Sequence, residues 1–121
     1  MQSYTPAVAN TVFVDMVAKL DGEPIVAGSV NLYLIAMSGA NAGKWFKSLD
    51  STWSAVEVVS GTATHQADGH WTGSILAAAW TTGLSYCLYG KETTDLHIPV
   101  AEEVVEISTP KNVTIIEVTD A

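Results

Sequence analysis

The stretch from Thr62 to Tyr89 constrains the fold of this chain more than any other. Asp68-Gly69 lies between two β-compatible arms, Thr62–Ala67 and His70–Ile75. A two-residue Asp-Gly loop is typical of type I′ hairpins, because both turn residues need positive φ and the resulting twist matches the strands. Gly83 then opens a third run in which alternate apolar residues share one face. This stretch therefore predicts a sheet-rich fold.

Further runs of alternating apolar residues predict strands on both sides of this hairpin. They are Thr11–Leu20, Ser29–Met37, Lys44–Lys47, Trp53–Val59, Leu84–Tyr89, Glu103–Ser108 and Asn112–Val118. Seven to nine short strands between turn residues, with no convincing helix, predict an all-β fold, an antiparallel β-sandwich of the immunoglobulin-like type. The Ala-rich run Ile75–Trp80 is too short to hold a helix by itself. It is interpreted as either a bulged strand or a single helical turn.

The chain has the length of one domain with one core, at 121 residues. Residues 1–10 are small and polar and are interrupted by Pro6, which predicts an N-terminal arm that is ordered only if it docks on something. Residues 11–121 are predicted to form the single β-sandwich domain. No basic start with an apolar stretch marks a secretory signal, and no apolar run approaches the roughly 20 residues of a membrane span.

The charge balance argues against nucleic acid as a partner. Thirteen acidic and five basic residues give a net charge of −8, and no arginine occurs. Such a field repels phosphate backbones, so nucleic acid is not an expected partner. A membrane is not expected either, because no apolar run is long enough to span one. Charged residues make up only 15% of the chain, against about 25% in average globular proteins. Either the core is dense and the surface short of charge, or part of the surface is buried against other subunits.

Two segments together resemble a known class of module. Residues 21–34 run from an Asp-Gly-Glu-Pro turn through Gly28 into a Val-x-Leu strand, as at the opening of immunoglobulin-like and carboxypeptidase-regulatory-like (prealbumin-type) β-sandwiches. Residues 62–75 and the Gly-Leu-Ser-Tyr of residues 83–86 are similar to the later part of the same modules. The longer segment 76–82 and two further strands after Lys91 depart from the pattern. The resemblance implies a module without catalytic residues, of a kind that serves as spacer, adhesion unit, sugar binder or bacteriophage head or tail component.

The residues that could carry chemistry form no recognised constellation. His65 and His70 flank the Asp-Gly turn and could approach across the hairpin near Asp68, while His97 is distant in sequence. A zinc site needs three or four ligands in fixed geometry, and no tight histidine pair is present, so exposed hairpin histidines are favoured. No nucleophile elbow, calcium loop or phosphate-binding loop occurs either. We therefore expect no catalytic, metal or cofactor residues, hence no enzyme. Cys87, the single cysteine, allows no intrachain disulfide and is interpreted as a packed residue.

The four tryptophans are the best hint of function in the sequence. Each lies at a strand end or beside a loop: Trp45, Trp53, Trp71 and Trp80. Packed inward they would be core residues with a partner for the indole N–H, at a subunit contact they would be aromatic anchors, and exposed in a row they would stack on sugar rings. The sequence leaves these three alternatives open.

The ends of the chain predict contacts with other subunits. The strand Asn112–Val118 carries Val113 and Ile115 on one face and Ile116 and Val118 on the other. A strand with two apolar faces is normally covered on both sides, whereas a terminal edge strand has neighbours of its own chain on one side only. These four residues are therefore a candidate assembly strand.

These observations favour a non-enzymatic structural module. The predicted role is a bacteriophage virion protein (capsid decoration, head or tail component), made in the host cytoplasm and located in the virion. Its copies would join each other or other virion proteins through apolar surface and terminal arms. The alternative is a carbohydrate- or surface-binding β-sandwich module that uses exposed tryptophans.

Overall fold

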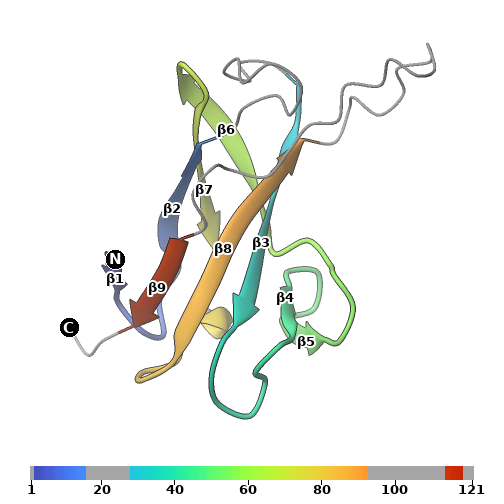
Figure 1. The fold of residues 1–121 in the computed structure, drawn as a ribbon, viewed down its shortest axis with the longest axis vertical. Helices are drawn as coiled ribbons and strands as arrows, with labels where there is room; N and C mark the ends of the chain where they lie inside the picture. Colours follow the sequence, from blue (N-terminus) through green and yellow to red (C-terminus); the bar gives the residue numbers. More distant parts are fainter. Residues whose placement is uncertain (1, 16–27, 93–113, 119–121) are drawn as a thin grey trace.

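The computed structural model describes residues 2–15, 28–92 and 114–118, and these form an all-β, antiparallel, sandwich-like fold (Figure 1). The elements are β1 (Gln2–Tyr4), β2 (Asn10–Asp15), β3 (Val30–Ala36), β4 (Trp45–Lys47), β5 (Thr52–Ser54), β6 (Gly61–Ala67), β7 (His70–Ile75), the 3₁₀ turn η1 (Ala77–Ala79), β8 (Ser85–Glu92) and β9 (Thr114–Val118). The predicted fold class is confirmed. Within the described segments no helix has the length and apolar character needed to cross a membrane. The predicted strand 103–108 and the second half of the predicted strand 11–20 lie outside the described residues.

The order of the strands explains how one sheet encloses a core. The sheet runs β1-β9-β8-β3-β6-β7-β2, and every pair is antiparallel except β1 with β9. Its two end strands, β1 and β2, are consecutive in the chain and are joined by residues 5–9 alone. A connection of this length reaches at most about 18 Å when fully extended. The sheet must therefore bend until its two edges approach, and β2 indeed contacts β8, with which it shares no ladder.

The predicted alternation along β3 sets the inner face of this fold. Val30, Leu32, Leu34 and Ala36 are each at most 1% exposed, while Asn31 and Ile35 on the opposite face are only half-buried. The same alternation in β2 buries Val12 and Val14 and leaves Phe13 55% exposed. Tyr86 and Leu88 of β8 complete this core, with Phe46 of β4, Trp71 and Ile75 of β7, and Ala79 and Trp80 at η1.

The central hairpin is confirmed in its turn residues. β6 and β7 are joined by Asp68 and Gly69, whose φ angles are 46° and 87°. Both values are positive, as the type I′ turn requires. A register shift between His65 and Ala67 adds a bulge just before the turn.

Changing Gly69 to Val is expected to lower the free energy of unfolding by more than about 1 kcal/mol, because a β-branched residue is strained at this positive φ. Urea denaturation of the two proteins measures the difference. Asp68→Asn is the matched control, since asparagine tolerates the left-handed region and should stay within about 0.5 kcal/mol of wild type. Equal stability of the valine variant would contradict the assigned turn.

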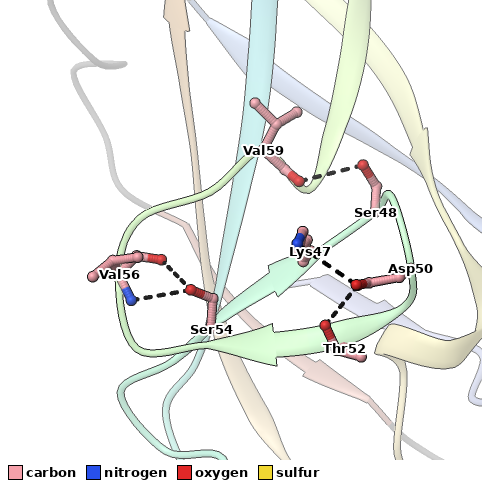
Figure 2. Close-up of polar contacts among 7 residues, drawn as sticks. All are labelled: Lys47, Ser48, Asp50, Thr52, Ser54, Val56 and Val59. Atoms are coloured by element: carbon pink, nitrogen blue, oxygen red, sulfur yellow. Dashed lines mark hydrogen bonds and ion pairs between the residues drawn. The ribbon is translucent and has the colours of Figure 1, made fainter.

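The predicted strand Trp53–Val59 is wrong beyond its first residues. β5 ends at Ser54, and residues 55–60 leave the sheet as a loop (Figure 2). The cause is local, because the Ser54 hydroxyl accepts the Val56 N–H (3.1 Å) and donates to the Val56 carbonyl (2.8 Å). Such side-chain bonds replace the ladder bonds that a strand would need. Val56 is consequently 70% exposed instead of facing a partner strand.

The Ala-rich segment adopts the helical alternative. Ala77–Ala79 form a single 3₁₀ turn, and Trp80 leaves it in extended conformation. The buried Tyr86 hydroxyl donates to the Ala79 carbonyl (2.7 Å) and accepts the Thr81 N–H (2.9 Å). These bonds give the end of the turn the partners that a short helix lacks.

Residues 2–4 of the predicted N-terminal arm are ordered on a strand of their own chain. They form β1, which pairs in parallel with β9 in the register Gln2↔Ile116, Ser3↔Glu117 and Tyr4↔Val118. β9 also pairs with β8, so it is an inner strand with neighbours of its own chain on both sides. The edge position expected for the C-terminal strand is therefore occupied by β1.

Candidate functional site

Two of the four tryptophans belong to the core. Trp71 and Trp80 are each 3% exposed. The Trp80 indole N–H donates to the Ile75 carbonyl (3.1 Å), and its ring stacks on Tyr4 with centroids 5.2 Å apart. The partner for the indole nitrogen is the one that buried tryptophans require. The four tryptophans therefore do not form one exposed row for a sugar.

The other two tryptophans are half-buried beside the β4–β5 hairpin. Trp53 packs edge-on against Phe46 (centroids 5.4 Å) and stacks on Tyr86 (6.3 Å), so one side of it extends the core. Trp45 lies on the other face of β4, where its indole N–H donates to the Tyr89 hydroxyl (2.8 Å). It thereby joins a group of polar and aromatic side chains on the outer face of β3 and β8.

This group, the outer-face cluster, consists of Tyr33, Trp45, Glu57, Tyr89 and Lys91. The rings of Tyr33 and Tyr89 stack with centroids 5.2 Å apart, and the Lys91 ammonium lies 5.6 Å and 6.0 Å from them. Lys91 also donates to one Glu57 oxygen (2.8 Å), and the Tyr89 hydroxyl donates to the other. The cluster ties the loop 55–60 to β8.

The pKa shifts within the outer-face cluster follow from the contacts between its members. Partial burial would raise the pKa of Glu57, but the hydrogen bonds from Lys91 and Tyr89 outweigh it and hold that pKa below its ordinary value. Partial burial and the Glu57 carboxylate raise the pKa of Tyr89. The residues thus satisfy one another, and the ammonium covers the tyrosine rings. We interpret the cluster as structural: it holds the loop 55–60 against β8. Sequence reasoning missed it because its members come from four separate segments.

The histidines lie on opposite faces of the hairpin. His65 pairs in register with the buried Trp71, packs edge-on against its ring (5.2 Å) and accepts the Gly69 N–H (3.3 Å). His70 is the neighbour of Trp71 and so points to the outer face, where it pairs with Asp15. Among the described residues no three His, Cys, Asp or Glu side chains gather to hold a metal ion, and His97 lies outside them.

Of the candidate assembly strand, the structure describes only the backbone of β9. Ile115 pairs with Cys87, and Ile116 pairs with Tyr86 on one side and Gln2 on the other. Val118 pairs with Tyr4, and Val113 lies outside the described residues. Partial burial raises the pKa of the Cys87 thiol, in keeping with a packed residue.

Three connections at one end of the sandwich contain no ionisable residue, and we name them together the neutral end. It consists of the connections 5–9, 37–43 and 76–84, none of which contains an Asp, Glu, Lys, Arg or His. The three meet in space, because Ala7 N–H donates to the Trp80 carbonyl (3.1 Å) and Ser85 N–H donates to the Ser38 hydroxyl (3.1 Å). All three lie in the lower half of Figure 1, away from the Asp68-Gly69 turn.

The neutral end also exposes large apolar side chains. Val8, Met37 and Leu76 are 47%, 51% and 45% exposed, one from each of its three connections. Antiparallel pairing of Asn10 with Ile75 brings Val8 and Leu76 to the same margin of this end. The absence of charge could have been read from the sequence, but the meeting of the three connections could not.

Comparisons with protein-family models, with curated proteins and with solved structures give no match. The resemblance to immunoglobulin-like and prealbumin-type modules therefore remains a prediction from the turn and core motifs.

Proposed function

We propose that this chain is a non-enzymatic structural module that assembles with other subunits through its neutral end. The observation that carries the proposal is the gathering of three uncharged connections with exposed Val8, Met37 and Leu76 in a chain of net charge −8. Apolar side chains that gather in one place, unlike scattered ones, mark surfaces that bind other proteins.

Electrostatics favours a contact at this end over one elsewhere. Two copies of an acidic chain repel each other, and a contact that buries unpaired carboxylates is weakened by the free energy needed to desolvate them. The three connections of the neutral end contain no ionisable side chain that would have to leave water. The first charged residue beyond the three connections is Lys44.

The proposed setting is a bacteriophage virion, as a capsid decoration, head or tail component. This setting follows from the class of module that the turn and core motifs resemble. A carbohydrate-binding role is less favoured, because Trp71 and Trp80 are buried and the face of the Tyr33–Tyr89 pair is occupied by Lys91.

Light scattering on the full chain at tens of micromolar is expected to give a mass above that of one copy. The double substitution Val8→Lys and Leu76→Lys should return the chain to a monomer of unchanged fold, because two ammonium groups would have to be desolvated in the contact.

The control variant is Thr62→Lys and Thr64→Lys, which places the same two charges on exposed residues of β6. Both variants bring the net charge closer to zero and so weaken general repulsion equally. Loss of assembly in the first variant alone assigns the contact to the neutral end. A monomeric wild-type chain that binds a glycan would overturn the proposal in favour of the binding module.

A further inference from the structure

β1 is one edge strand of the sheet, and β2 is the other. β1 pairs with β9, and the short connection 5–9 between β1 and β2 brings the two edges together. The same ladder could be supplied by β1 of a second copy, with identical contacts. In the closed arrangement β1 lies on β9 of its own chain, and in the exchanged arrangement it lies on β9 of a second copy. The connection 5–9 decides the equilibrium between these two arrangements, because only its conformation differs between them.

That connection is strained in the closed arrangement. Ala7 has a φ of 62°, a left-handed conformation that costs a residue with a Cβ atom a factor of about 5 to 30 in the equilibrium. An extended connection, as strand exchange requires, releases this strain. The backbone strain at Ala7 therefore disfavours the closed turn, whereas the bond from the Ala7 N–H to the Trp80 carbonyl (3.1 Å) favours it.

A set of hydrogen bonds opposes the strain. The Asn10 side chain donates to the carbonyls of Thr5 (2.8 Å) and Val8 (3.1 Å) and accepts the Thr5 N–H (3.3 Å). These bonds span the turn and exist only while it is folded back. Asn10 and Ala7 thus act on the same equilibrium in opposite directions.

We infer that β1 is exchanged between copies of this chain, so that β1 of one copy lies on β9 of the next. The inference rests on the proposed function, since it names the partner, a second copy, and the segment that links the two. The extended connection reaches at most about 18 Å, so the exchanging copies have to lie against each other at the neutral end. The three connections there contribute no like charges, and Val8 beside the hinge is covered.

Cysteine pairing between different chains tests the exchange directly. Ser3 and Glu117 are register partners in β1 and β9. Neighbouring strands lie about 4.8 Å apart, within the Cα range of a disulfide. One chain carries Ser3→Cys and the other Glu117→Cys, both with Cys87→Ser, and the two are incubated together at high concentration and oxidised. We expect mass spectrometry to find the 3–117 bridge in large excess over the 3–3 and 117–117 bridges, because closed monomers would form all three only by random collision. Equal amounts of the three bridges would contradict the exchange.

Substitutions in and beside the connection 5–9 test whether the strain at Ala7 favours the exchange and whether the Asn10 bonds oppose it. In a chain carrying both cysteines, Ala7→Gly should lower the ratio of interchain to intrachain bridges by about fivefold or more, because glycine relieves the strain of the closed turn. Ala9→Gly removes the same methyl group from the same connection and should leave the ratio unchanged, since Ala9 is not among the positive-φ residues. Asn10→Ala should raise the ratio.

The outcomes separate this inference from the proposed function. Intrachain bridges alone, in a chain that still assembles and loses assembly on Val8→Lys with Leu76→Lys, would overturn the exchange and leave the neutral end as the contact. No 3–117 bridge of either kind would also overturn it, since β1 would then not lie on β9. Intrachain bridges in a chain that is monomeric throughout would overturn both.

Discussion

Replacing Gly73 by Ala is expected to cause a large loss of stability, although it adds only one methyl group. A Cβ atom at this position would lie 2.2 Å from the Thr62 carbonyl oxygen and 2.7 Å from the Leu32 Cδ1 atom. Gly73 sits in the middle of β7, between β6 and β2, opposite Ala63 and Val12. The oxygen belongs to a neighbouring backbone, so relief requires the sheet itself to shift.

The expected loss is about 3 kcal/mol or more, at the upper end of what overpacking costs in a core. Equilibrium unfolding in urea measures it. Gly43→Ala and Gly83→Ala are matched controls, because an added Cβ meets nothing within 4 Å at either position. Their positive φ angles, 82° and 83°, should cost only about 1–2 kcal/mol each. A Gly73 variant no less stable than these would contradict the close approach of β6 and β7.

Gly73 also shows what a sequence can and cannot give. A lone glycine inside a strand pattern is a known sign of close backbone approach, so the position could be flagged. The atom it approaches could not be named, because that depends on which strand pairs with β7 and in what register. The same holds for the order β1-β9-β8-β3-β6-β7-β2, which brings together residues far apart in the chain.

The sequence was sufficient to predict a feature where one turn residue, or one alternation of apolar and polar residues, determines the local structure. The Asp68-Gly69 turn and the buried face of β3 follow from turn chemistry and from the period of two. The strand beyond Ser54 was mispredicted because its apolar pattern competes with a serine turn that no periodicity reveals.

For the candidate site the sequence was less informative. Trp71 and Trp45 look alike as strand aromatics, yet the first is buried by the bend of the sheet and the second faces outward to Tyr89. The neutral end depends on three connections that are each unremarkable alone. Its assembly from them is a property of the topology.

Replacing Ser60 by Ala is expected to destabilise the fold by more than about 2 kcal/mol, although it removes one oxygen atom. The ladder on one side of β3 divides here, because β6 pairs with Val30–Leu32 and β4 only with Ile35. Leu34 lies between these two ladders. Its N–H donates to the Ser60 hydroxyl (2.8 Å), which in turn donates to the Phe46 carbonyl (2.7 Å). Ser60 is 1% exposed, so water does not replace these bonds.

Ser54→Ala is the matched control, because the Ser54 hydroxyl also bridges a backbone N–H and a backbone carbonyl, both of Val56. Val56 is 70% exposed, so its groups can turn to water and the loss should stay below about 1 kcal/mol. Hydrogen exchange at the Leu34 amide gives a second readout, and it should quicken in the Ser60 variant more than at amides of the β6–β7 hairpin. Equal losses of stability in the two variants would mean that burial does not set the cost. In that case the divided ladder of β3 would need another support.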